Sequence, residues 1–275
     1  MNNLVQRTIT GALFVAAILA SIYFQPSYHV LSILFFFVTC IALDEFYKMV
    51  NQFEGVKVPT WGWIAAGLLL YGAVAEYARF EQFFVLPVFA LVLIALILWE
   101  LFRNEKLPMQ NIAFGIMGLV LVALPFGYLN MIAVPSQIHF VFALFILIWV
   151  SDTGAYLVGS QIGKHKMFVR VSPKKSWEGL IGGVVFCLAT SILFWYLYSS
   201  VWPVETPVSW WKWLLFGVII AIFGTLGDLT ESLLKRSAGV KDSGNILPGH
   251  GGLLDRFDSL ILCIPVIYIY LTFVI

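Results

Sequence analysis

Acidic, basic and hydroxyl side chains are concentrated in two segments of an otherwise apolar chain. Within residues 228–258, Asp228, Ser232 and Lys235 follow i, i+4, i+7 spacing, which puts a carboxylate, a hydroxyl and an ammonium group on one helical face. Proteins bind Mg²⁺ through one or two carboxylates, with phosphate oxygens and water completing the shell. The pattern therefore indicates a divalent cation beside an anionic phosphate. The alternative is an amphipathic helix end whose Lys235 and Arg236 reach the membrane surface.

The next part of this segment, residues 241–252, is rich in turn-forming residues. Gly251 and Gly252 can present successive backbone N–H groups to an anion. His250 can donate to a phosphate oxygen or to a leaving group. These features indicate an anion-binding loop, and an ordinary glycine-rich connection is the alternative.

The segment ends with Asp255, Asp258 and Ser259 on one face, near the expected start of the last helix. A single Asp at that position is usually a cap that interacts with the helix dipole. Two on one face, beside Arg256 and facing Asp228, favour metal ligation. We therefore predict Asp228 and Asp255 as metal ligands, with Asp258 as a further candidate.

A second charged segment, residues 159–178, contains hydroxyl and basic groups directly before an expected helix, an arrangement that suits a polyphosphate. Its candidate substrate-binding residues are Ser172, Lys174, Lys175, Ser176 and Glu178. A positive-inside topology signal would also explain the lysines. Upstream, Asp152 lies within or at the end of an apolar run, where an ionisable residue indicates function. A structural Asp152–Lys pair is the alternative.

The composition determines which elements position these residues. Of 275 residues, 61% are hydrophobic and only 11% are charged, whereas soluble globular chains are about 25% charged. This excludes a soluble enzyme, a nucleic-acid-binding domain, a disordered chain and a coiled coil. The sequence predicts an all-α, polytopic transmembrane bundle.

About nine apolar runs approach the roughly 20 residues that a spanning helix needs. They cover residues 8–25, 28–43, 60–75, 83–102, 112–134, 139–158, 179–200, 210–227 and 257–275. With the N-terminus in the cytoplasm, 14 of the 16 Lys and Arg residues fall on the inner side, and only Arg79 and Lys212 fall outside. Because basic residues favour the cytoplasmic side, the C-terminus is expected outside.

The two charged segments cannot lie within the bilayer. Residues 228–258 contain nine charged side chains, and at about 3 kcal/mol each their burial at the bilayer centre would cost on the order of 27 kcal/mol. We therefore predict cytoplasmic loops at 159–178 and 228–258. They belong to a C-terminal catalytic region, 139–275, which follows N-terminal transmembrane helices, 1–138.

The charged segments resemble the phosphatidate cytidylyltransferases, also called CDP-diacylglycerol synthases. The resemblance rests on sixteen specified positions over the 27 residues 232–258. They read Ser232-x-Leu234-Lys235-Arg236-x4-Lys241-Asp242-x-Gly244-x2-Leu247-Pro248-x-His250-Gly251-Gly252-x2-Asp255-Arg256-Phe257-Asp258. The segments around Ser151-Asp152 and Ser172–Gly179 are also similar to that family. Residues 1–140 match only as apolar helices.

The resemblance implies that the chain joins CTP and phosphatidic acid into CDP-diacylglycerol and pyrophosphate, with Mg²⁺. It makes Asp228, Lys241, Asp255 and Arg256 the expected catalytic residues. The expected substrate-binding residues are Asp152, Ser172, Lys174, Lys175, Ser176, Glu178, Ser232, Lys235, Arg236, His250, Gly251 and Gly252. The expected partners are CTP, phosphatidic acid and membrane lipid, with a homodimer as a candidate assembly and no nucleic acid. A bacterial inner membrane with the active site facing the cytoplasm fits this expectation.

Two other functions are compatible with the same groups. A CTP-dependent kinase of a polyprenol or similar lipid alcohol needs comparable nucleotide and metal ligands, but it would release CDP. An ion or metabolite transporter can also place Asp152 and Asp228 at membrane depth. Transporters more often show interrupted helices in paired halves near the midplane, whereas the charges here gather on one side.

Overall fold

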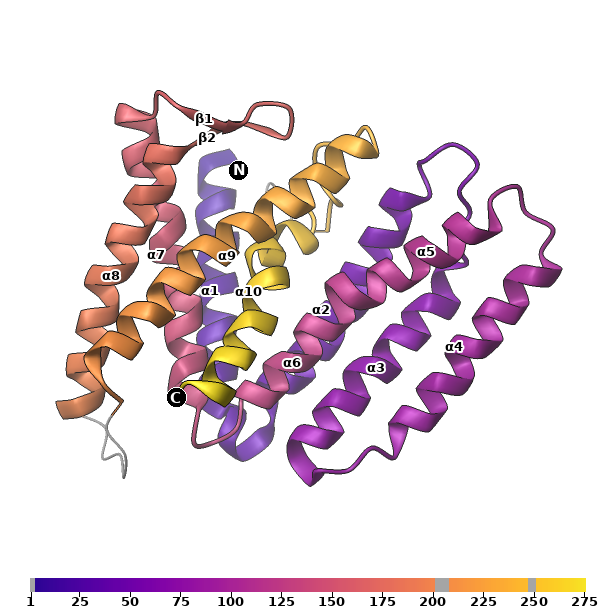
Figure 1. Ribbon diagram of the computed structural model, residues 1–275, viewed down its shortest axis with the longest axis horizontal. Coiled ribbons are helices and arrows are strands. Elements are labelled where there is room, and N and C mark those ends of the chain that lie inside the picture. Colours follow the sequence, from indigo (N-terminus) through magenta and orange to yellow (C-terminus); the bar gives the residue numbers. More distant parts are fainter. Residues whose placement is uncertain (1–2, 201–207, 247–250) are drawn as a thin grey trace. The chain divides into compact units, whose positions relative to one another are not determined.

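The computed structural model describes residues 3–200, 208–246 and 251–275, and most of these residues are helical (Figure 1). The helices are α1 (Asn3–Tyr28), α2 (Val30–Val50), α3 (Thr60–Phe80), α4 (Val85–Phe102), α5 (Pro108–Gly118), the π-helical η1 (Leu119–Ala123), α6 (Leu124–Ile132), α7 (Ile138–Ile162), α8 (Trp177–Ser200), α9 (Trp210–Ser237) and α10 (Leu254–Phe273). Two short strands, β1 (Lys166–Phe168) and β2 (Ser172–Ser176), form an antiparallel hairpin.

Each of the nine predicted spans coincides with a helix, α5, η1 and α6 together forming one of them. Within the described part of the chain, eight helices are long and apolar enough to cross a membrane. The ninth, α3, is not among these eight. The prediction of an all-α, polytopic membrane protein is confirmed.

The chain forms two compact units. The first contains Met1–Ile138 together with Leu234–Phe257, and the second contains His139–Leu233 together with Asp258–Ile275. The predicted boundary also lies after residue 138, but the prediction places all later residues in one region. In the structure, the end of α9, the loop that follows and the first turn of α10 belong with the N-terminal helices.

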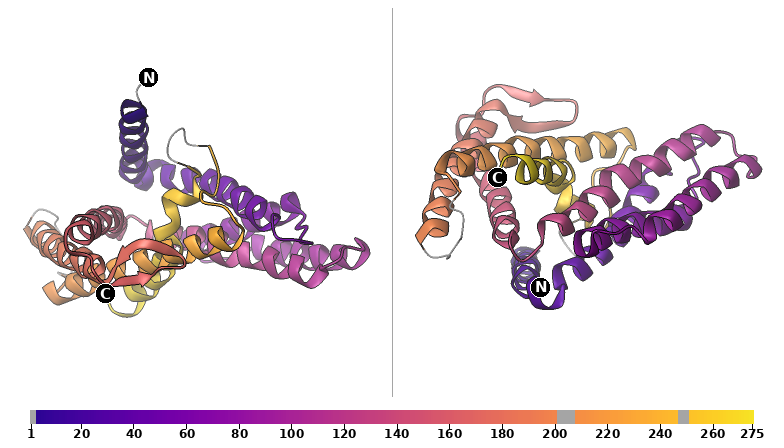
Figure 2. Two further views of the ribbon diagram at one scale, coloured as in Figure 1. Left: turned by 90° about the horizontal axis from the view of Figure 1, so that it is seen from above. Right: turned by 60° about the horizontal axis from the view of Figure 1, so that its bottom comes forward.

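In the first unit, α3 packs against α2, α4 and α6. Figure 2 shows α1 running steeply across the direction of α3, α4 and α5. Glycines allow large rings to pack close to helix backbones: a Cβ at Gly115 would collide with Trp63, and one at Gly118 with the ring of Tyr47. The hydroxyl of Tyr47 donates to the carbonyl of Gly115 at 2.9 Å. This packing anchors the C-terminal half of α2, which also carries Glu45.

The π-helical turn η1 ends at Ala123, two residues before Pro125, the second residue of α6. A proline inside an α-helix removes one hydrogen bond, and its ring meets the carbonyl four residues earlier. A wider π-turn moves that carbonyl away from the ring. The turn thus lets one span continue from Pro108 to Ile132.

In the second unit, α7 and α8 pack closely because α8 begins with several glycines. A Cβ at Gly182 would meet the side chain of Val158, and one at Gly183 would lie 3.0 Å from the carbonyl oxygen of Ser151. Small residues allow this close approach between membrane helices. The β1–β2 hairpin joins the two helices at one end, as Figure 2 also shows.

In both charged segments the loop is shorter than predicted, because the neighbouring helices extend into the segment. α7 continues to Ile162 and α8 begins at Trp177, so the first segment is mainly the hairpin. α9 continues ten residues beyond Gly227, to Ser237, since polar groups in 228–237 can share faces of an amphipathic helix. The helix stops before Gly239, whose φ of +73° suits a glycine at a helix C-terminus.

Candidate active site

A pocket of about 550 Å³ opens in the second unit, lined by α7, the hairpin, the start of α8 and α9. The predicted site residues that line it are Asp152, Lys174, Lys175, Ser176 and Asp228. Lys166 and the exposed ring of Tyr156 also line this pocket and were not predicted. Lys166 could have been recognised as a third lysine in the same charged segment. Residues from 152 to 228 therefore contribute three ammonium groups and two carboxylates to one pocket.

Asp228 and Lys175 form the central ion pair of this pocket. The Lys175 Nζ lies 2.6 Å from Asp228 Oδ2, and the two side chains are 24% and 31% exposed. Lys175 also donates to the carbonyl of Thr225 at 3.3 Å. On the same helix, the Ser232 hydroxyl donates to Asp228 Oδ1 at 3.2 Å. Asp228 is therefore held in place but remains accessible from the pocket.

The hairpin positions the lysines of the pocket. Ser176 is buried, and its hydroxyl accepts the N–H of Gly179 at 3.2 Å, which caps the start of α8. Glu178 accepts the N–H of His165 at 3.1 Å and contacts its ring Nδ1 at 2.5 Å. Ser172 lies opposite Phe168 in the strand register. Glu178 and Ser172, predicted as substrate-binding, thus have roles in the hairpin and do not line the pocket.

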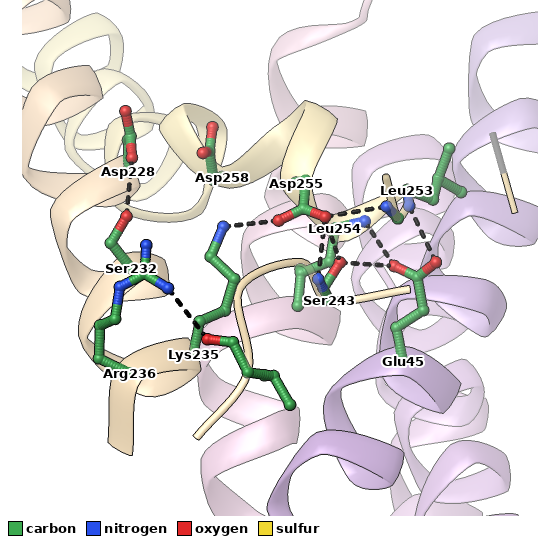
Figure 3. A network of polar contacts seen from close by, with 12 residues as sticks. Glu45, Asp228, Ser232, Lys235, Arg236, Ser243, Leu253, Leu254, Asp255 and Asp258 are labelled. Carbon is green, nitrogen blue, oxygen red and sulfur yellow. Dashed lines mark hydrogen bonds and ion pairs between the residues drawn. The ribbon is translucent and has the colours of Figure 1, made fainter. Parts of the chain in front are cut away.

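In the first unit, Lys235 and Asp255 form a second, more deeply buried ion pair (Figure 3). The Nζ–Oδ1 distance is 2.5 Å, and the side chains are only 10% and 6% exposed. The other carboxylate oxygen of Asp255 accepts the N–H groups of Ser243 at 2.9 Å and Gly252 at 2.8 Å. The N–H of Gly252, predicted to bind a substrate anion, is therefore bound to Asp255 here.

Glu45 of α2 belongs to this second cluster and was not among the predicted site residues. It is 2% exposed and contacts the loop before α10 through Ser243, Leu253 and Leu254. The signal available in the sequence was an acidic residue within an apolar run, which indicates function or a specific partner. Its partners, some 200 residues later, could not be read from spacing.

The remaining predicted residues lie at the surface or outside the described part. Lys241 and Arg256 are exposed, and their side chains have no hydrogen-bond or ion-pair partner among the described residues. Arg236 donates to the carbonyl of Val240 at 3.1 Å. Gly251 has a φ of +79°, which favours glycine. His250 lies outside the described residues.

The carboxylates predicted as metal ligands are divided between the two units. Asp228 lies in the second and Asp255 in the first, each with its own lysine. Asp258 accepts the N–H of Ser259 at 2.6 Å. No group of three or more His, Cys, Asp or Glu side chains suited to a metal occurs in residues 3–200, 208–246 and 251–275. An accessible carboxylate with a neighbouring hydroxyl still suits Mg²⁺, which takes most of its shell from phosphate and water.

Comparison with known proteins identifies the family. Residues 5–274 match the profile of the Cytidylyltransferase family. The chain belongs to this family. Among its relatives, the phosphatidate cytidylyltransferase of Bacillus subtilis (strain 168) is 33% identical over 278 residues, covering 98% of each chain.

Two staphylococcal relatives with the same name are also similar over most of the chain. The phosphatidate cytidylyltransferase of Staphylococcus saprophyticus is 33% identical over 260 residues, which cover 93% of this chain and 96% of that protein. The one from Staphylococcus aureus (strain COL) is 36% identical over 235 residues, covering 84% and 85%. The similarity to family members therefore includes the N-terminal helices as well as the charged segments.

Proposed function

We propose that this membrane protein transfers the cytidylyl group of CTP to phosphatidic acid, giving CDP-diacylglycerol and pyrophosphate, with Mg²⁺. The family membership and the names of the relatives support this activity. The observation that carries it is the pocket that Lys166, Lys174 and Lys175 line together with Asp228, to which Lys175 is paired. That combination suits a polyphosphate bound together with a divalent cation.

The obstacle to this reaction is electrostatic, because two anions must approach each other. A phosphate oxygen of phosphatidic acid attacks the α-phosphorus of CTP, a new P–O bond forms, and the bond to the β-phosphate oxygen breaks to release pyrophosphate. The attacking oxygen is already ionised, so no nucleophile from the protein is needed. Positioning and neutralisation of charge supply most of the catalysis in such transfers.

The pocket lysines bind the triphosphate in this proposal. Lys174 is exposed on the hairpin, while Lys175 reaches Asp228. When phosphate oxygens enter, the ammonium of Lys175 turns to them, and Asp228 becomes available as a ligand. Lys235, Arg236, Lys241 and Arg256 neutralise the two substrates.

Asp228 and Asp255 would hold Mg²⁺, with Asp258 as a further ligand. When bound there, Mg²⁺ would supply positive charge that stabilises the negative charge developing on the phosphates. Both proposed ligands have an ammonium group at 2.5–2.6 Å, which marks both as sites where a positive charge is favourable. Ser243 and Gly252 keep Asp255 oriented through their N–H groups.

The proposed location is a bacterial inner membrane with the site facing the cytoplasm, as the distribution of Lys and Arg favours. Acyl chains then remain in lipid while the headgroup meets CTP at the interface. The homodimer stays a prediction, which crosslinking in native membranes can measure.

The test is an assay of purified protein with radiolabelled CTP and detergent-solubilised phosphatidic acid, with and without Mg²⁺. We expect labelled CDP-diacylglycerol and one pyrophosphate per turnover, and only in the presence of the cation. Labelled CDP formed with a polyprenol would identify a lipid-alcohol kinase instead. Solute flux into proteoliposomes without CTP would favour a transporter.

A further inference from the structure

Glu45 is a buried acid near the end of an apolar helix. It is 2% exposed, whereas its neighbour Asp44 forms a surface pair with Lys48, whose side chain is 71% exposed. Burying a carboxylate is costly unless hydrogen bonds compensate for lost water. The hydrogen-bond partners of Glu45 therefore indicate the role of this buried carboxylate.

Those partners lie in the loop that precedes α10. Glu45 accepts the N–H of Leu253 at 2.9 Å and that of Leu254 at 2.8 Å, one on each carboxylate oxygen (Figure 3). The first N–H groups of a helix have no partner within the helix, and a negative charge there is favoured by the helix dipole. A side chain of α2 thus performs the capping of a helix that begins about 200 residues later.

The loop is also shaped to fit closely around this carboxylate. A Cβ at Gly252 would lie 2.6 Å from Glu45 Oε2, and one at Gly244 would collide with Glu45 Oε1. Only glycine allows both backbone segments to approach so near. The loop therefore touches Glu45 on both sides of residues 247–250.

The same loop carries the donors to Asp255. The hydroxyl of Ser243 lies 3.1 Å from Glu45 Oε2 and 3.0 Å from Asp255 Oδ2, and it donates its single proton to one of them at a time. The N–H groups of Ser243 and Gly252 donate to Asp255 as well. Whatever fixes this loop also fixes the orientation of the Asp255 carboxylate.

We infer that Glu45 is a positioning residue for the nucleotidyl-transfer site. It anchors the loop containing residues 243–246 and 251–253, and through this loop it holds Asp255 in the orientation that a divalent cation requires. The inference rests on the proposed function, in which Asp255 is a metal ligand. Catalytic geometry must be held within about 0.5 Å by supporting contacts, so loss of the anchor affects turnover more than nucleotide capture.

The experiment compares Glu45→Gln, which keeps the shape but presents an amide N–H₂ to one backbone N–H, with the matched control Asp44→Asn. Amide hydrogen exchange is followed at residues 243–254, and Mn²⁺ affinity, kcat and the KM for CTP are measured. For Glu45→Gln we expect at least tenfold faster exchange at Leu253 and Leu254, at least fivefold weaker Mn²⁺ binding and at least a tenfold loss of kcat. The KM for CTP should change less than threefold, and Asp44→Asn should match wild type within twofold.

Faster exchange with unchanged kcat and Mn²⁺ affinity would overturn the inference, because Glu45 would then be purely structural. Ser243→Ala provides a second test if Glu45→Gln fails to fold, since it removes the shared hydroxyl and leaves both N–H contacts of Glu45 intact. It should lower Mn²⁺ affinity without accelerating exchange at Leu254, and unchanged affinity would contradict the proposed link. If Asp255→Asn retains wild-type Mn²⁺ affinity and turnover, the metal assignment fails. The hydrogen-exchange result for Glu45→Gln would still show whether Glu45 holds the loop in place, because that measurement does not depend on a metal.

Discussion

The Lys175–Asp228 pair leads to a prediction about competition between an ammonium group and a metal ion. Replacing Lys175 with Met removes the cation 2.6 Å from Asp228 Oδ2 and retains most of the aliphatic side chain. Pairs at exposed positions are worth about 0.2–1 kcal/mol, and this one, 24% and 31% exposed, belongs near the upper end. A divalent cation no longer has to displace that interaction. At about 1.4 kcal/mol per tenfold change, removal of a 1 kcal/mol competitor strengthens binding about fivefold.

The assay is a titration of purified protein with Mn²⁺, followed by electron paramagnetic resonance without nucleotide. Lys175→Met should bind Mn²⁺ about fivefold more tightly than wild type. The same variant should bind CTP about ten- to a hundredfold more weakly, since a hydrogen bond to a charged group is worth about 1.5–3 kcal/mol. Tighter Mn²⁺ binding together with weaker CTP binding would show that Lys175 and the metal compete for Asp228, because general damage to the pocket would weaken both.

Lys174→Met is the matched control, because Lys174 lines the same pocket but has no acidic partner among the described residues. Its Mn²⁺ affinity without nucleotide should stay within twofold of wild type. If Lys175→Met binds Mn²⁺ no more tightly, or if Lys174→Met gains equally, the ammonium of Lys175 and the metal do not compete for Asp228.

Other substitutions test the remaining contacts. Asp228→Ala or Asp255→Ala should abolish pyrophosphate release from CTP and phosphatidic acid while the protein stays folded, and near-normal turnover of either purified variant would refute the metal assignment. Gly252→Ala should lower kcat at least tenfold, because the new Cβ would collide with the Ser243 hydroxyl; a wild-type rate would show that the loop can relax without cost. Lys48→Ala should change the rate less than twofold, since Lys48 is a surface residue paired only with Asp44 among the described residues; a hundredfold loss, about 2.7 kcal/mol of barrier, would extend the site to that end of α2.

Local sequence patterns predicted the spans, and they singled out several residues that line one pocket. Apolar runs of sufficient length must form helices in lipid, since every backbone polar group needs an internal partner. The stripe that carries Asp228 and Ser232 is a property of one helix, and the two side chains do contact each other. One short hairpin carries Lys174 and Lys175 and directly follows α7, the helix that carries Asp152. Because the connection is short, these three side chains can line the same pocket.

Contacts between distant segments could not be predicted in this way. Nothing in residues 30–50 shows that Glu45 caps a helix starting at residue 254, because capping by a distant side chain leaves no local motif. The contact between Glu178 and His165 was likewise not predicted, since it depends on the register of two short strands. Periodicity describes one element at a time, whereas these partners are set by tertiary packing.

The separation between Glu45 and its partners also bears on biosynthesis. The donors of Leu253 and Leu254 follow Glu45 by 208 and 209 residues, which at about 5–20 residues per second corresponds to roughly 10–40 s of translation. During that time the acid on α2 has no permanent partner, and any stand-in must be water or a transient neighbour. Formation of these Glu45 contacts is therefore among the last events in the maturation of the nascent chain, and premature termination before residue 253 would leave Glu45 without the N–H groups that compensate for its burial.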